Sequence, residues 1–143
     1  MTHMRTIYWM GGVAAFAFVL LLRPSYPRAQ GSVEGYPEVS PSSARETIAK
    51  RSGDPGFVLL DVRTRKEFDA ERIGGAVMVD YLSPSFRDEI AKLDRGKTYL
   101  VYCRTGNRTR GALKAMRELG FPNVSVLDGG IVKWKEAGFP TAR

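Results

Sequence analysis

From residue 57 onward, short apolar runs alternate with longer segments in which polar residues dominate. Each run has four or five residues, which is strand length, and the segment after it shows helical spacing or helix-start signals. This alternation predicts βαβ units, a parallel sheet and the α/β class. The predicted strands are a short edge strand near Val39 and residues 57–61, 76–79, 98–102 and 124–127. The predicted helices are one ending near Ala49 or Arg51 and residues 64–70, 84–93, 110–119 and 130–137.

The N-terminal part of the chain contains a long apolar stretch. Residues 7–22 carry no charge, and as a helix they would extend about 24 Å, against ~30 Å for the hydrocarbon core of a bilayer. We expect residues 1–29 to form a signal peptide or an N-terminal membrane anchor with the start of a linker. Residues 30–36 would complete the linker, and residues 37–143 would form the domain. Ala29 is the only residue suited to precede a signal-peptidase cut, so cleavage stays open.

This stretch predicts export to the periplasm or another extracytoplasmic location. An uncleaved segment would anchor the protein to the cytoplasmic membrane.

Composition narrows the classes of function. Three of the 22 basic residues precede the first acidic residue, Glu34, which leaves 19 basic and 15 acidic residues in the rest of the chain. This mild excess contains no Lys/Arg block, so it favours small anions over nucleic acid as ligands. The single His and single Cys provide no metal-ligand constellation and no intramolecular disulfide. We expect one domain, a monomer and no cofactor.

Cys103 lies where a predicted strand gives way to a polar loop. Backbone N–H groups of the loop and of the following helix start have no helical acceptor, and together with Arg104 and Arg108 they would stabilise an anion such as a thiolate. A lone cysteine is more often a small buried hydrophobe. Such a cysteine would sit inside the strand, so its place at the polar exit favours a nucleophile.

Asp61 ends another predicted strand, and Arg63 follows it in the loop. Ligands of open parallel sheets bind at the carboxyl ends of the strands, so these side chains could reach the same rim as Cys103. The sequence leaves open a purely structural alternative, in which Asp61 caps the next helix and pairs with Arg63.

Several segments, in correct order, resemble the rhodanese-like domain. They are residues 60–68 (LDVRTRKEF), 73–76 (IGGA), 101–108 (VYCRTGNR), 119–124 (LGFPNV) and 127–131 (LDGGI), with Trp134. The resemblance extends from about Val39 to Pro140. It implies a single domain with a central five-stranded parallel sheet and helices on both faces. Arg72 departs from the pattern, because the family commonly has His there, and this would alter the rim of the site.

The resemblance also implies sulfur transfer through a persulfide that maps onto Cys103. The Cys103 thiolate would attack the outer sulfur of an anionic donor such as thiosulfate, and the persulfide would pass its sulfur to cyanide or a thiol. Such a cycle needs one nucleophile and no second cysteine. Arg108, together with Arg104, would neutralise the negative charge of the donor.

The other loop residues are predicted to shape the site. Gly106 would supply a backbone conformation that a Cβ obstructs, and Thr105 and Asn107 would hold the loop by local hydrogen bonds. The residues assigned to the site are the catalytic Cys103 and the substrate-site residues Arg108, Arg104, Thr105, Gly106, Asn107, Thr109, Asp61 and Arg63, with no metal ligand.

Two alternative functions remain open. Related phosphatases and arsenate reductases use a loop one residue longer, with an arginine at the sixth position after the cysteine. Here Thr109 occupies that position, which favours sulfur over phosphate. The second alternative is a non-catalytic rhodanese-like module that binds a partner, because a sequence cannot show turnover.

Overall fold

The computed structural model describes residues 31–143, and the apolar stretch predicted to direct export lies outside the described residues. Within residues 31–143, no helix is long and apolar enough to cross a membrane. The export and anchoring expectations therefore stay predictions.

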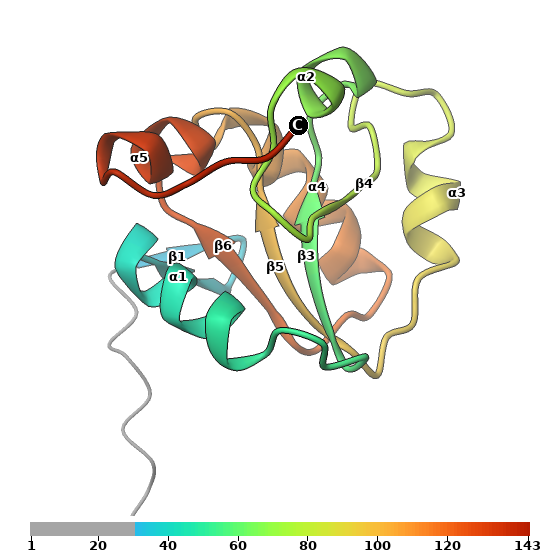
Figure 1. Ribbon diagram of the computed structural model, residues 1–143. Coiled ribbons are helices and arrows are strands. Elements are labelled where there is room, and N and C mark those ends of the chain that lie inside the picture. Colours follow the sequence, from blue (N-terminus) through green and yellow to red (C-terminus); the bar gives the residue numbers. More distant parts are fainter. Residues whose placement is uncertain (1–30) are drawn as a thin grey trace, which may run out of the picture.

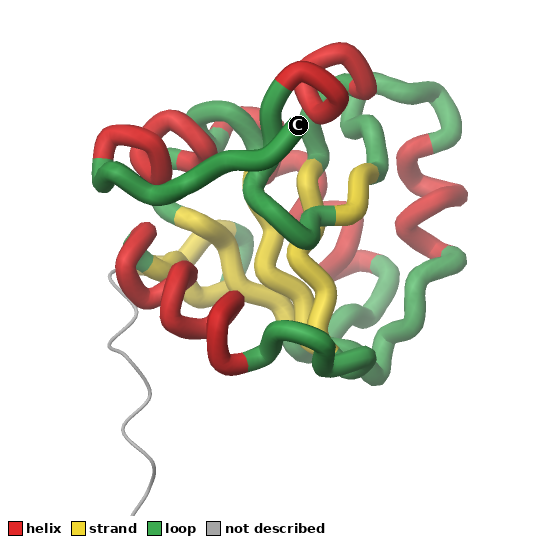
Figure 2. Tube along the Cα trace, viewed as in Figure 1, coloured by secondary structure: helices red, strands yellow, loops and turns green. Residues whose placement is uncertain are grey.

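The described residues form an α/β fold with one central sheet (Figures 1 and 2). Its strands lie in the order β1-β2-β6-β5-β3-β4, and every neighbouring pair except β1 and β2 is parallel. The strands are β1 (Gly31–Val33), β2 (Tyr36–Val39), β3 (Phe57–Asp61), β4 (Val77–Met78), β5 (Thr98–Tyr102) and β6 (Val124–Leu127).

The sheet differs from the prediction of five parallel strands. It is mixed, because β1 adds a sixth, antiparallel strand built from residues that the sequence assigned to the linker 30–36. Glu34 and Gly35 form the two-residue turn to β2, with φ angles of 51° and 82°. Positive φ at both turn positions matches the twist of a tight hairpin. The strand was missed because three residues are too few to show a periodic pattern.

Helices cover both faces of the sheet (Figure 1), as predicted. The helices are α1 (Pro41–Lys50), α2 (Arg65–Ala70), α3 (Phe86–Ala91), α4 (Asn107–Glu118) and α5 (Gly130–Glu136). Side chains of β5 alternate between the two faces: Tyr99 and Val101 pack with α3 and α4, whereas Leu100 and Tyr102 pack with α1 and α5. Trp134 of α5 belongs to the second cluster and so lies in the core.

Candidate active site

Cys103 is the first residue after β5, which lies between β6 and β3 in the middle of the sheet. Its side chain is buried, with 1% of the residue exposed. The Sγ atom accepts a hydrogen bond from the Gly106 backbone N–H at 3.1 Å, and Thr109 Oγ1 lies 3.9 Å away. The structure therefore places the thiol against a backbone donor, as the sequence predicted.

Residues 103–109, here called the cysteine loop, include the first three residues of α4. The helix begins at Asn107, three residues before the predicted start, and Gly106 caps it with φ 115°, where a side chain would be strained. This earlier start brings the positive end of the helix dipole close to Sγ. Thr109 is buried and donates its hydroxyl to the Gly106 carbonyl at 2.6 Å, so Thr109 closes the loop.

The side chains of Thr105 and Asn107 do not have the loop-holding role predicted for them. Both residues are exposed, and within residues 31–143 neither side chain makes a hydrogen bond. The sequence expectation rested on residue type alone, and it was the buried Thr109 that supplied the local bond.

The start of α5 holds the beginning of the cysteine loop. The N–H of Ile131 donates to the Cys103 carbonyl at 3.0 Å, and the N–H of Val132 donates to the Arg104 carbonyl at 3.1 Å. Gly130 precedes them with φ 59°, and a Cβ there would lie 2.5 Å from the Arg104 carbonyl oxygen. Only glycine allows this approach, which gives Gly130 a physical reason that the sequence did not reveal.

Arg108 is bound by Glu67 of α2. Its Nη1 donates to Oε2 at 2.6 Å and its Nη2 donates to Oε1 at 2.8 Å. Glu67 also completes a capping box, since Thr64 donates its backbone N–H and its hydroxyl to Oε2. The hydrogen bonds from Arg108, followed by those from Thr64, lower the pKa of Glu67 from its ordinary 4.5 to about 2. The carboxylate is therefore charged at neutral pH and neutralises the arginine predicted to bind the donor.

Glu67 was not recognised from the sequence. A capping box needs Thr or Ser followed by Glu three residues later, and Thr64 and Glu67 have this spacing. That signal would have marked the start of α2 but not a partner 41 residues further along the chain.

Asp61 and Arg63 form a buried ion pair near the same edge of the sheet. Asp61 is 0% and Arg63 4% exposed, and Arg63 Nη2 lies 2.7 Å from Asp61 Oδ2. Arg63 also donates to the Glu71 carbonyl at 2.6 Å. Pairing, the second half of the structural alternative, is thus confirmed, whereas the cap of α2 is Thr64 and not Asp61. A substrate contact by either residue stays a prediction.

A cleft of about 430 Å³ opens between α2 and α5 beside the cysteine loop. Its lining residues are Arg63, Glu67, Ala70, Glu71, Arg104, Ile131, Val132, Lys135 and Glu136. Of its cations, Arg63 pairs with Asp61, and Lys135 pairs with Glu71 at 2.8 Å. Arg104 is exposed, and its side chain contacts no hydrogen-bond or ion-pair partner in the described part of the chain. Arg104 is therefore the lining cation available to an anion.

Arg72, the departure from the family pattern, lies beside α2 and binds the C-terminal residues. Its backbone exchanges two hydrogen bonds with Ala142, at 2.9 and 2.7 Å, and its Nη2 donates to the Arg143 carbonyl at 3.0 Å. The guanidinium also lies 4.8 Å from the centre of the Phe68 ring. Arg72 therefore binds the C-terminal residues Ala142 and Arg143 to the segment that follows α2.

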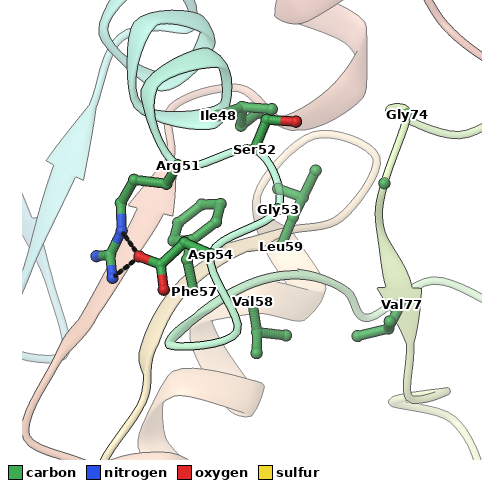
Figure 3. A pocket seen from close by; sticks show the side chains of 11 residues that line it. Ile48, Arg51, Ser52, Gly53, Asp54, Phe57, Val58, Leu59, Gly74 and Val77 are labelled. Carbon is green, nitrogen blue, oxygen red and sulfur yellow. Dashed lines mark hydrogen bonds and ion pairs between the residues drawn. The ribbon is translucent and has the colours of Figure 1, made fainter.

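A second cavity, of about 210 Å³, lies between the end of α1, the start of β3 and the segment before β4 (Figure 3). Among its lining residues the ionisable side chains are Arg51 and Asp54, which bind each other, with Arg51 Nε 2.9 Å from Asp54 Oδ2. Because β3 and β5 are parallel, the start of β3 and the end of β5 lie at opposite edges of the sheet. This cavity is therefore separate from Cys103.

Comparisons with known proteins agree with this geometry. Residues 44–137 match the family model described as "Rhodanese-like domain". The chain is 34% identical over 102 residues to "Uncharacterized protein slr1261" of Synechocystis, covering 70% of this chain and 55% of that protein. It is 35% identical over 82 residues to "Thiosulfate sulfurtransferase GlpE" of Pseudomonas savastanoi, covering 57% and 76%.

A solved structure with the same fold is the rhodanese-related protein of Thermoplasma volcanium. It superposes with a TM-score of 0.64 at 28% identity and covers 75% of this chain and 98% of that one. The relatives differ in length from this chain, which spans about half (55%) of the Synechocystis protein and 20% of "Probable adenylyltransferase/sulfurtransferase MoeZ" of Mycobacterium tuberculosis.

Proposed function

Because the chain belongs to the rhodanese-like domain family, we propose that it is a sulfurtransferase whose nucleophile is Cys103. The observation that carries the proposal is the hydrogen bond from the Gly106 N–H to Sγ at the start of α4. A backbone donor at a helix N-terminus favours an anionic sulfur, first as the thiolate and then as the persulfide.

The reaction consists of two displacements. The Cys103 thiolate attacks the outer sulfur of an anionic sulfane donor such as thiosulfate, so that a new S–S bond forms and the bond to the sulfonate sulfur breaks. Sulfite leaves with the electron pair of that bond. The acceptor, cyanide or a thiolate, then attacks the terminal sulfur, and Cys103 departs as a thiolate ready for another cycle.

Arg104 is the side chain that suits the donor's negative charge. It lines the cleft, and it has no ion-pair partner among the described residues, whereas the guanidinium of Arg108 is engaged by Glu67. A cation in the lining of the cleft that forms no ion pair of its own can attract the sulfonate.

Thr109 distinguishes this site from the phosphatase alternative. In the longer phosphatase loop, an arginine at the sixth position after the cysteine would bind two oxygens of a tetrahedral oxyanion. Here the sixth position is a buried hydroxyl bonded to Gly106, and the arginine one residue earlier is bound to a carboxylate. These contacts favour sulfur transfer as the function.

The proposal is tested by the intact mass of the protein before and after incubation with thiosulfate. We expect a gain of one sulfur atom that subsequent cyanide removes, and no gain in Cys103→Ser. If the folded wild-type protein gains no sulfur, the proposed function fails. A parallel assay with a phosphate ester would then test the phosphatase alternative.

A further inference from the structure

The cysteine loop is held by contacts from both sides. At its beginning, N–H groups of α5 bind the carbonyls of Cys103 and Arg104. At its end, Arg108 is bound by Glu67 of α2, the contact described above. Between these two attachments lies Gly106, whose N–H is directed at Sγ.

The binding of Arg108 by Glu67 matters because of the residue that lies between the two attachments, Gly106. It has no side chain to pack and its φ is 115°, and its carbonyl is held from α4 by the hydroxyl of Thr109, the residue after Arg108. A glycine peptide can rotate at little cost. The direction of its N–H therefore depends on the residues that are fixed on either side of it.

The Glu67–Arg108 pair has the geometry needed to fix the chain on the C-terminal side of Gly106. Both carboxylate oxygens and both Nη atoms take part, so the guanidinium is held in one orientation. The side chain of Arg108 is 20% exposed and that of Glu67 is 30% exposed, and partial burial reduces screening by water and salt. The hydrogen bonds from Thr64 fix the carboxylate in turn.

We infer that Glu67 is a positioning residue for sulfur transfer, which acts through Arg108 to keep the Gly106 N–H directed at the Cys103 sulfur. The inference rests on the sulfurtransferase function proposed above. It assigns Arg108 to holding the loop and leaves the charge of the donor to Arg104.

The test compares Glu67→Gln, Arg108→Ala and the double variant in transfer of sulfur from thiosulfate to cyanide. Glutamine keeps the size of the side chain but provides a single acceptor oxygen and no charge. We expect each single variant to lower kcat about tenfold, equivalent to ~1.4 kcal/mol of activation free energy. The double variant should fall no further, and KM for thiosulfate should stay within about twofold of wild type, because no donor contact is removed.

A matched control is Glu118→Gln. This substitution removes the carboxylate from another arginine pair, Arg87–Glu118, which joins α3 to α4 away from the cysteine loop. Its kcat should equal that of wild type. The comparison separates the loss of this particular pair from a general effect of weakening α4.

Alkylation of Cys103 by the neutral reagent iodoacetamide gives a readout that does not depend on sulfur transfer. We expect alkylation at pH 7 to be about tenfold slower in Glu67→Gln, in Arg108→Ala and in the double variant, because a misdirected N–H stabilises the thiolate less. If wild type takes no sulfur from thiosulfate, the proposed function fails, and this measurement still decides the role of Glu67.

Three results would overturn the inference. The first is a Glu67→Gln variant with wild-type kcat and alkylation rate. The second is a double variant in which the losses of kcat in the two single variants are additive in activation free energy. The third is a lower KM for thiosulfate in Glu67→Gln that disappears when Arg108 is also replaced, because Arg108 would then be a donor-binding cation that Glu67 masks.

Discussion

The close approach of Gly130 to the cysteine loop can be tested by adding one methyl group at this position. In Gly130→Ala the new Cβ would lie 2.5 Å from the Arg104 carbonyl oxygen and 2.7 Å from its carbonyl carbon. Both contacts involve backbone, which cannot swing away as a flexible side chain can. We expect the start of α5 to move off the cysteine loop.

The magnitude follows from the contacts that would be lost. An L-residue at φ 59° costs ~1–2 kcal/mol relative to glycine. Displacement of α5 also breaks the two hydrogen bonds from Ile131 and Val132 to the loop, and each contributes about 0.5–1.5 kcal/mol. The free energy of unfolding should therefore fall by about 2–5 kcal/mol in total.

Gly120→Ala is the matched control. Gly120 has a similar φ of 79°, but a Cβ there meets nothing within 4 Å. It should therefore show the conformational cost alone. The difference between the two variants, about 1–3 kcal/mol, isolates the contact of α5 with the cysteine loop.

The assay is urea unfolding followed by far-UV circular dichroism, together with the rate at which thiosulfate loads sulfur onto Cys103. Gly130→Ala should lose both stability and loading rate, and Gly120→Ala should keep the wild-type rate. The reasoning is refuted if the two variants lose equal stability and load sulfur equally fast.

Three further predictions concern single side chains. Arg104→Ala should raise KM for thiosulfate about tenfold in steady-state kinetics, the effect of ~1.4 kcal/mol of lost charged contact, and an unchanged KM would exclude Arg104 as the donor's partner. The pKa of Glu67 is lowered from 4.5 to about 2, so its pairing stabilises the fold fully above about pH 5, and this stabilisation is lost as the pH falls towards 2. The free energy of unfolding, measured against pH, should fall by at most ~3 kcal/mol from this cause, and the fall should be absent in Glu67→Gln. Thr109→Val keeps the shape of the side chain but removes the hydroxyl that donates to the Gly106 carbonyl, so urea unfolding should show a loss of about 0.5–1.5 kcal/mol, and wild-type stability would mean that the bond contributes little.

The parts of the fold that could be predicted from the sequence are those fixed by local pattern. Residues 98–102 and 124–127 form strands with the predicted bounds, because each is an apolar run between turn signals. The start of α4 was placed too late, since Asn107, Arg108 and Thr109 are polar and show no helical pattern by themselves. Their helical conformation follows from the tertiary contacts of the loop.

The features of the candidate site also divide into those set by local sequence, which could be predicted, and those set by contacts between distant segments, which could not. The position of Cys103 after a central strand is a local feature, and the sequence revealed it. Contacts between distant segments could not be predicted: Glu67 binds Arg108, and α5 binds the carbonyls of Cys103 and Arg104, from which α4 and β6 separate it along the chain. Those contacts depend on how the crossovers place α2 and α5, which no single segment encodes.

The two sides of the cleft differ in how firmly they are attached to the sheet. Four of the five residues of β5 are buried, whereas within the described domain no residue of α2 is buried. Amide hydrogens of β5 should therefore exchange with solvent only on global unfolding, and those of α2 through local opening. Local opening of α2 would therefore carry Glu67 away from Arg108 while Cys103 stays in place at the end of β5, so the hold on the far end of the cysteine loop is only as stable as α2.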